Sequence, residues 1–332
     1  MKRRDFMKLS AGFGAAAALM PLSPVGAQTK SVFKASDVQP PGYPTVAATE
    51  NLGKKLEAAT NGRLSVQMFP SMQLGGEKET IEQTQIGAIQ MLRVSVGTMG
   101  PIVDDINVVN MPFLFRNTAH AQKMMDGPIG QELLDKITAS PNAGLVALSW
   151  MDSGARSLYN TKKPIKTIED LKGLKFRVIG NPIFVDMMNA LGGNGVAMGY
   201  DQVFSALQTG VIDGAENNPP SYVFSNHYTA AKYYSLTEHL IIPEVLLFSK
   251  KAWSSLSGDD QSLIKKFARE AQLEERDLWN KYEKLAMEKA LAAGCQVSEI
   301  TDKKPFQDAV KPVWDKYGPK YQDMVKRIQA IA

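Results

Sequence analysis

The sequence predicts an α/β protein of two lobes, with mostly parallel sheets and one long helix that spans the lobes. Two stretches alternate strand-like and helix-like patterns, and a third is almost uninterrupted helix pattern. Strands that alternate with helices build parallel sheets covered by helices on both faces. The chain has 332 residues, and a protein of about 300 residues is usually organised around more than one core.

The first α/β unit begins at residues 31–36, which alternate as a strand. A helix is predicted at 44–60, where Val46, Leu52 and Leu56 recur at helical spacing before a stop at Asn61 and Gly62. The same rhythm continues with a strand at 63–68, a helix at 77–86 and a strand at 90–94.

The second α/β unit repeats this alternation. Its predicted elements are strands at 144–150, 175–179 and 195–198 and helices at 182–191 and 201–209. Residues 210–222 are rich in Gly, Pro and Asn, so Glu216 and Asn217 fall where a strand enters a loop. Sheets of this kind bind ligands at that edge.

A single long helix is predicted at 258–293. Its apolar residues recur every three or four positions, and Gly294 supplies a stop. A helix of this length suits a spine that joins two lobes.

The N-terminus has the pattern of an export signal over residues 1–27. Basic residues precede an apolar stretch at 9–20, which is shorter than the roughly 20 residues that span a bilayer, and cleavage is expected near Ala27. Arg3 and Arg4 favour the twin-arginine route, with an ordinary secretory signal as the alternative. The sequence therefore predicts a periplasmic protein.

Charge and cysteine content limit the possible partners. The formal net charge is +4, of which +3 belongs to the first 27 residues, so the remainder is close to neutral. Nucleic acid and anionic membranes attract clustered basic residues, and neither is expected as a partner. Cys295 is the only cysteine, so no internal disulfide forms.

Two arginines suggest a site for an organic acid. Arg156 and Arg177 precede the run Asp213-Gly-Ala-Glu-Asn-Asn-Pro-Pro-Ser-Tyr222. A guanidinium presents planar donors that fit a carboxylate two bonds at a time, and asparagine amides add further donors. An anionic small molecule is the expected ligand.

Four segments resemble the solute-binding proteins of tripartite ATP-independent periplasmic (TRAP) transporters, the DctP family. They are Met72-Gln-Leu-Gly-Gly-Glu-Lys-Glu79, Asn110-Met-Pro-Phe-Leu-Phe115, Leu171-Lys-Gly-Leu-Lys-Phe-Arg-Val178 and Ala206-Leu-Gln-Thr-Gly-Val-Ile-Asp-Gly-Ala-Glu-Asn217. The resemblance runs from about Val32 to the C-terminus. It implies a clamshell of two domains that close on one ligand, a chain that crosses between them more than once, and a two-subunit membrane permease as partner.

The predicted lobes are discontinuous in sequence. The first lobe comprises 28–153 and about 243–282, and the second comprises 154–242 and about 283–332.

The resemblance also implies roles for individual residues. Arg177 matches the arginine that binds the ligand carboxylate bidentately, Arg156 a second arginine, and Asn217 an asparagine that donates its amide. The sequence is closer to the uronate-binding branch, in which Glu77, Arg93 and the pair Asn217 and Asn218 have counterparts. Gln39 stands where a histidine is expected, which leaves the hydroxyl pattern and the epimer open.

Each of these residues also has a structural interpretation. Arg93 could pair with an acid across the cleft, Glu77 could stabilise the N-terminus of its own helix, and Asn218 suits a turn. C4-dicarboxylates, keto acids and aromatic acids are alternative ligands. An enzyme acting on sugar acids is a more distant alternative, because common hydrolase and metalloprotease motifs are missing from the sequence. No cofactor or metal is expected, since the three histidines are widely separated.

Overall fold

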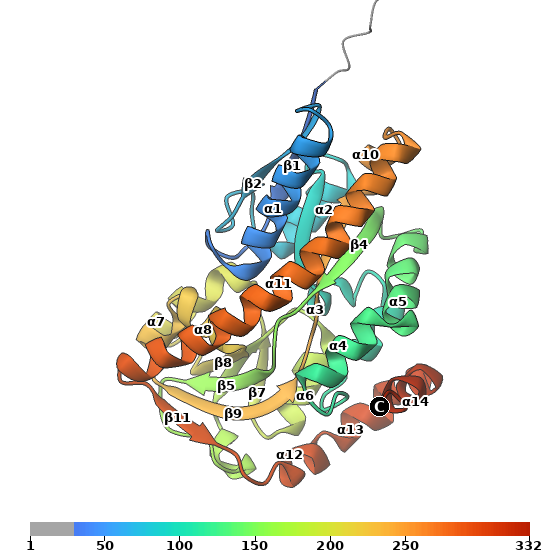
Figure 1. The fold of residues 1–332 in the computed structure, drawn as a ribbon. Coiled ribbons are helices and arrows are strands. Elements are labelled where there is room, and N and C mark those ends of the chain that lie inside the picture. Colours follow the sequence, from blue (N-terminus) through green and yellow to red (C-terminus); the bar gives the residue numbers. More distant parts are fainter. Residues whose placement is uncertain (1–29) are drawn as a thin grey trace, which may run out of the picture.

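The computed structural model describes residues 30–332, which fold into two α/β lobes (Figure 1). The predicted export signal at 1–27, with its cleavage near Ala27, lies outside the described residues. The first lobe is built on a five-stranded sheet of order β2-β1-β3-β10-β4, and the second on a six-stranded sheet of order β11-β9-β5-β8-β6-β7. The two-lobed α/β fold is thus confirmed.

The strands of each sheet come from separate parts of the chain. The first sheet contains β1 (Ser31–Ser36), β2 (Leu64–Phe69), β3 (Met91–Ser95), β4 (Leu145–Met151) and β10 (Glu244–Ser249). The second contains β5 (Arg156–Asn160), β6 (Lys175–Val178), β7 (Asn194–Ala197), β8 (Gly214–Asn217), β9 (Tyr233–Leu240) and β11 (Gln296–Glu299).

Helices cover both sheets. In the first lobe these are α1 (Pro44–Ala59), α2 (Glu77–Gln85), α3 (Val96–Met99), α4 (Thr118–Asp126), α5 (Pro128–Ala139) and α10 (Lys250–Trp253). In the second lobe they are α6 (Pro182–Ala190), α7 (Val203–Thr209), α8 (Pro219–Phe224) and α9 (His227–Ala230). Pro44 opens α1, where the missing N–H of proline costs no hydrogen bond.

The sheets are more mixed than the sequence pattern predicts. Of the nine strand pairings in residues 30–332, five are parallel and four antiparallel. All four antiparallel pairings involve β5 or β10. Each of these strands directly follows a short crossing between the lobes. These strands are buried along their whole length, so they lack the alternation that identifies a strand in sequence.

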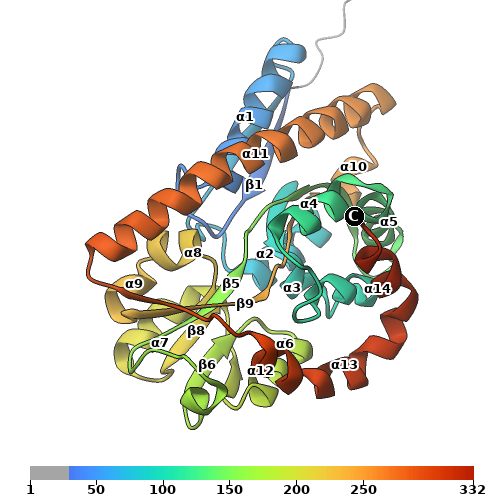
Figure 2. The same cartoon turned by 60° about the horizontal axis from the view of Figure 1, so that its bottom comes forward.

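Four connections join the lobes: residues 152–155 between β4 and β5, residues 241–243 between β9 and β10, α11 (Gly258–Ala292), and the C-terminal segment that follows β11. The Ser257 side chain accepts a hydrogen bond from the Asp260 N–H at the start of α11. This helix contacts α1 and β4 in the first lobe and α8 in the second (Figures 1 and 2). The predicted spine is present.

The C-terminal segment runs from the second lobe to the first, whereas the predicted boundaries place all of 283–332 in the second. It forms α12 (Lys304–Ala309), which contacts β9, α13 (Lys311–Tyr317), which contacts α6, and α14 (Gln322–Gln329), which reaches the first lobe. Figure 2 shows this segment passing below α6 toward α5. Arg327 of α14 pairs with Glu132 of α5 at 2.6 Å, and His120 Nε2 of α4 lies 2.9 Å from the Ile328 carbonyl oxygen. These two contacts anchor the last helix to the first lobe.

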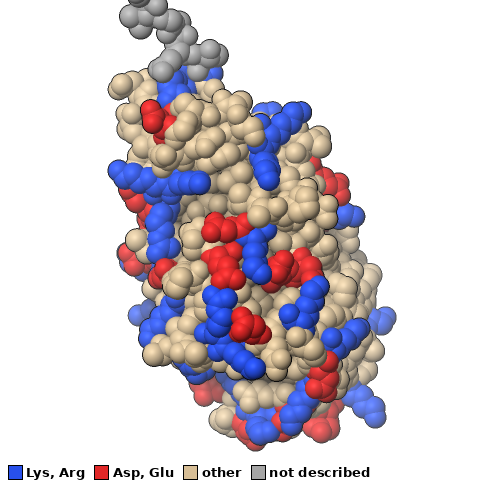
Figure 3. Space-filling view, turned by 90° about the vertical axis from the view of Figure 1, so that its right-hand side faces the viewer, with Lys and Arg blue, Asp and Glu red and all other residues tan. Residues whose placement is uncertain are grey.

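Surface charge and helix composition limit the possible contacts with a membrane. On the face in Figure 3, basic and acidic side chains are interspersed, so that face has no extended patch of one sign. Within residues 30–332, every helix is too short or too polar to span a bilayer.

Candidate functional site

The candidate site is a cavity between the two lobes. Its walls come from both: Val38, Gln39, Glu77, Arg93, Ser95 and Glu244 from the first lobe, and Arg156, Arg177, Ile179, Tyr200, Asn217 and Ser221 from the second. Six of the seven predicted ligand-binding residues line it, and Asn218 does not.

Arg177 is the buried cation of the cavity that has the fewest protein partners. It lies in β6 and is 4% exposed. Its Nε donates to the Met198 carbonyl oxygen at 2.8 Å, and its guanidinium carbon lies 5.7 Å from the centre of the Tyr200 ring. Burial lowers the pKa of Arg177 despite the attraction of Glu216, and the nearby charge of Arg156 acts in the same direction as burial. A buried cation in this state favours an anionic partner.

Arg156, by contrast, is largely occupied by Glu216. Its Nε and Nη2 donate to the two Glu216 carboxylate oxygens at 2.6 and 2.8 Å, and Nη2 also donates to the Glu216 carbonyl oxygen. Burial opposes ionisation of Glu216, but the charge of Arg156 holds its pKa down at about 2. The two arginines of the predicted carboxylate clamp therefore differ in their protein partners. Within residues 30–332 the terminal nitrogens of Arg177 donate no hydrogen bond, whereas those of Arg156 are hydrogen-bonded to Glu216 and Asn217.

Asn217 is oriented by its neighbours. Its Oδ1 accepts from Arg156 Nη1 at 2.7 Å and from the Asn218 N–H at 2.9 Å. Because the oxygen end of the amide is occupied, its NH₂ end is the one available to a ligand. This geometry suits donation to a carboxylate.

Asn218 caps a helix. Its Oδ1 accepts from the Ser221 N–H at 2.8 Å at the start of α8, and its side chain is buried. This hydrogen bond supports the structural interpretation of Asn218 as a turn and cap residue.

Arg93 lies among three carboxylates on the first-lobe wall. It pairs with Asp37, with Glu244 at 2.8 Å and with Glu77 at 3.6 Å. The charge of Arg93 is therefore balanced by protein carboxylates, which agrees with the alternative interpretation that Arg93 pairs with an acid. Burial raises the pKa of Glu244 to about 7, with Glu77 and Asp37 adding to the effect and Arg93 opposing it.

Glu77 and Gln39 present acceptors to the cavity. Glu77 is the first residue of α2, and its two oxygens accept from the Ser95 N–H at 3.0 Å and the Thr98 hydroxyl at 2.5 Å. Each carboxylate oxygen keeps a second lone pair. Gln39 Nε2 donates to Ser221 Oγ at 3.2 Å, and within residues 30–332 its buried Oε1 has no partner.

Sequence reasoning missed Glu216 and Glu244 as site residues. Both lie in strands that are otherwise almost entirely uncharged and fully buried. An isolated acid in such a strand requires a buried partner, and this signal is visible in the sequence.

The lobes touch on either side of the cavity. Gln39 of the first lobe bonds Ser221 of α8, and Asn181 Nδ2 at the start of α6 donates to Asn107 Oδ1 at 2.9 Å and to the Gly97 carbonyl oxygen at 3.1 Å. These contacts bridge elements of different sheets, so they describe a closed arrangement.

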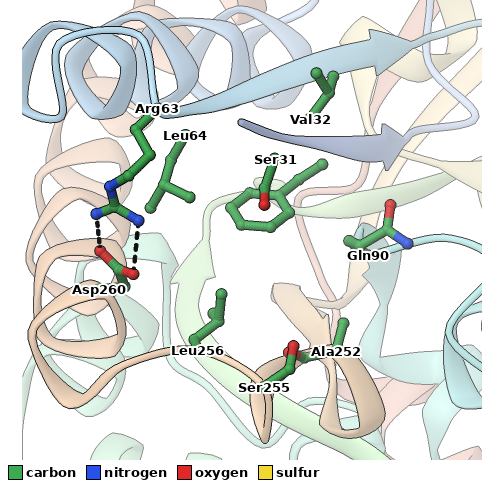
Figure 4. A pocket seen from close by; sticks show the side chains of 10 residues that line it. Ser31, Val32, Arg63, Leu64, Gln90, Ala252, Ser255, Leu256 and Asp260 are labelled. Atoms are coloured by element: carbon green, nitrogen blue, oxygen red, sulfur yellow. Dashed lines mark hydrogen bonds and ion pairs between the residues drawn. The ribbon is translucent and has the colours of Figure 1, made fainter. Parts of the chain in front are cut away.

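A second hollow lies on the outside of the first lobe, near the start of β1 (Figure 4). Arg63 and Asp260 at its edge form two hydrogen bonds with each other and so neutralise one another. It offers no charge comparable to that of Arg177. Among the described residues, no cluster of His, Cys, Asp and Glu is suited to hold a metal ion.

Comparisons with known proteins agree with this architecture. Residues 35–320 match the family model described as bacterial extracellular solute-binding protein, family 7 (DctP). A TRAP periplasmic solute-binding protein from Pseudomonas putida F1, solved with bound D-glucuronate, is 56% identical, with a TM-score of 0.89 over 91% of this chain and 97% of that one. A protein of the same kind from Bradyrhizobium sp., in complex with D-galacturonate, is 45% identical, with a TM-score of 0.87 over 90% and 99%.

A relative from Citrobacter koseri has been solved in two states. Its D-glucuronate complex is 47% identical over 91% of this chain and 100% of that one and gives a TM-score of 0.89. Its apo, open structure, 45% identical over 90% and 98%, gives 0.80. The conformation of the present chain is therefore nearer to the ligand-bound form. The family match over most of the chain and the two-lobed site show that this protein belongs to the DctP family of solute-binding proteins of TRAP transporters, a family of binding proteins rather than enzymes.

Proposed function

We propose that this protein captures a hexuronate, D-glucuronate or D-galacturonate, in the periplasm and delivers it to a TRAP membrane permease. The observation that carries the proposal is the buried guanidinium of Arg177, which faces a cavity whose opposite wall is rich in acceptors. A molecule with one carboxylate and several hydroxyls matches both walls. The D-glucuronate and D-galacturonate bound by the relatives from Pseudomonas putida and Bradyrhizobium support this ligand class.

In the proposed complex, the ligand carboxylate takes two hydrogen bonds from Arg177 and one from the Asn217 amide. The remaining N–H of Arg156 adds a donor on the same side. Glu77 and the Gln39 Oε1 accept from ligand hydroxyls. Charge-assisted hydrogen bonds are worth about 1.5 to 3 kcal/mol each, so the carboxylate contacts provide most of the affinity and the hydroxyl contacts select among acids.

Export and handover complete the proposal. The basic residues and short apolar stretch in 1–27 support export with cleavage near Ala27. The TRAP descriptions of the relatives support a permease as the partner. Closure of the lobes around the acid would give the permease a form to recognise.

A thermal-shift screen tests the ligand. The protein without residues 1–27, refolded to remove bound ligand, is heated with D-glucuronate, D-galacturonate, succinate, malate, pyruvate and benzoate. A ligand that binds only the folded state raises the melting temperature. Large shifts with uronates and small ones with the other acids are expected. A shift with succinate or malate alone would retain the receptor and replace the ligand class.

The role of Arg177 is tested by Arg177→Met, with Lys175→Met as the matched control. Lys175 is in the same strand, but its side chain is exposed to solvent. Losing two charge-assisted hydrogen bonds, about 3 to 6 kcal/mol, predicts that titration calorimetry with D-glucuronate shows at least a 100-fold loss for Arg177→Met. Wild-type affinity in this variant would refute the proposed carboxylate contact.

A further inference from the structure

The two walls of the cavity carry opposite charge. On the first-lobe wall, the single cation Arg93 pairs with Glu77 and Glu244, which line the cavity, and with Asp37 behind them. On the second-lobe wall, the two cations Arg156 and Arg177 accompany one carboxylate, Glu216. A ligand in the cavity therefore experiences a field that attracts an anionic group to one side and repels it from the other.

Glu244 is the acid that the sequence did not suggest for this wall. It opens β10 directly after the crossing at 241–243, lines the cavity and is 7% exposed. Its Oε2 accepts from Arg93 Nη1 at 2.8 Å, whereas within residues 30–332 its Oε1 accepts no hydrogen bond from a side chain. One oxygen is thus fixed by the protein, and the other is an acceptor at the cavity.

We propose that Glu244 is a specificity-determining residue, whose charge lets the first-lobe wall accept ligand hydroxyls and reject acids that place a second carboxylate there. The inference deepens the proposed function and rests on the carboxylate-binding role of Arg177. With one carboxylate held at Arg177, a dicarboxylate of similar length must bring its other carboxylate toward Glu244 and Glu77. A sugar acid brings hydroxyl donors to the same place.

The pKa of Glu244 sets the pH range over which this wall repels a second carboxylate. Burial raises this pKa to about 7, and the charges of Glu77 and Asp37 add to burial, while Arg93 opposes them. Glu244 therefore carries its full charge only above about pH 7, and there a further anion on this wall is repelled.

Glu244→Gln tests the inference, because it retains the side-chain shape and an acceptor oxygen while it removes the charge. Arg93 keeps Asp37 and Glu77 as partners, so the variant leaves no buried cation unpaired. Titration calorimetry is performed with D-glucuronate and with the dicarboxylates succinate and D-glucarate. Glu57→Gln, which alters an exposed carboxylate on α1, is the matched control.

The expected result for Glu244→Gln is a rise of at least tenfold in dicarboxylate affinity together with a severalfold loss for D-glucuronate. A purely structural role would weaken both classes alike, and an unchanged ratio of the two affinities, relative to Glu57→Gln, would overturn the inference. The wild-type titration separates the two proposals. If the wild-type protein binds neither D-glucuronate nor D-galacturonate, the proposed function fails, whereas wild-type binding with an unchanged ratio in Glu244→Gln defeats the role of Glu244 alone.

Discussion

Replacement of Gly97, which does not itself line the cavity, by alanine is expected to weaken ligand binding. Gly97 lies in α3 of the first lobe. A Cβ atom there would lie 2.8 Å from Phe184 Cε2 and 2.9 Å from Ile179 Cδ1, both in the second lobe. Carbon atoms in contact prefer about 3.5 to 4.0 Å, so the facing groups must separate by ~1 Å.

The size of the effect follows from where this strain acts. Overpacking a well-packed region costs about 1 to 3 kcal/mol. When the lobes separate, Gly97 and Phe184 move apart, so the cost falls on the closed form. Because ligand binding requires closure in the proposed function, affinity should fall about 5- to 150-fold.

The assay is titration calorimetry with D-glucuronate, with Gly180→Ala as the matched control. A Cβ atom at Gly180 would meet nothing within 4 Å, so that variant should bind like the wild-type protein. Small-angle scattering with saturating ligand should show less compaction for Gly97→Ala than for Gly180→Ala. Equal affinities in the two variants would refute the idea that this closed contact between α3 and α6 forms in the ligand complex.

Three further predictions concern buried polar groups. Arg156→Met should lower the free energy of unfolding by about 3 to 5 kcal/mol, because it leaves the Glu216 carboxylate buried without its partner; urea denaturation measures this, and a loss below about 1 kcal/mol would contradict it. Burial lowers the pKa of His227 to about 3, with the Arg177 charge adding to the effect. As pH falls from 6.5 toward 3, the unfolded chain takes up a proton that the native protein excludes, and stability should fall by about 1.4 kcal/mol per pH unit from this group. Glu244, whose pKa is raised to about 7, contributes in the opposite direction. The free energy of unfolding of the wild-type protein and of His227→Gln, measured at pH 7, 6 and 5, separates the two contributions. The same pH dependence in both proteins would exclude the contribution of His227. Asn218→Ala should lower stability by about 0.5 to 2 kcal/mol through the lost cap of α8, and a tenfold loss of D-glucuronate affinity would instead support the predicted ligand contact.

Eleven of the twenty-five α-helices and β-strands in residues 30–332 could be predicted from the sequence, and the sequence with its family resemblance indicated half of the residues that line the cavity. The predicted strand at 31–36 and the predicted helices at 77–86 and 258–293 agree with β1, α2 and α11 to within one residue at each end. These elements are visible because alternation and helical spacing depend on near neighbours in the chain. Arg177 and Asn217 could be found because their motifs lie at strand ends, where α/β sheets bind ligands.

Only the tertiary structure decided how these groups pair. Arg156 and Arg177 look alike in sequence. In the structure, Glu216 binds the guanidinium of Arg156, whereas Arg177 donates only from Nε to the protein. Arg93 gathers its carboxylates from three separate segments, and Glu244 arrives there only because β10 inserts between β3 and β4. Local pattern determines where helices and strands form, whereas the partner of a buried charge depends on contacts between residues far apart in the chain, which only the folded protein brings together.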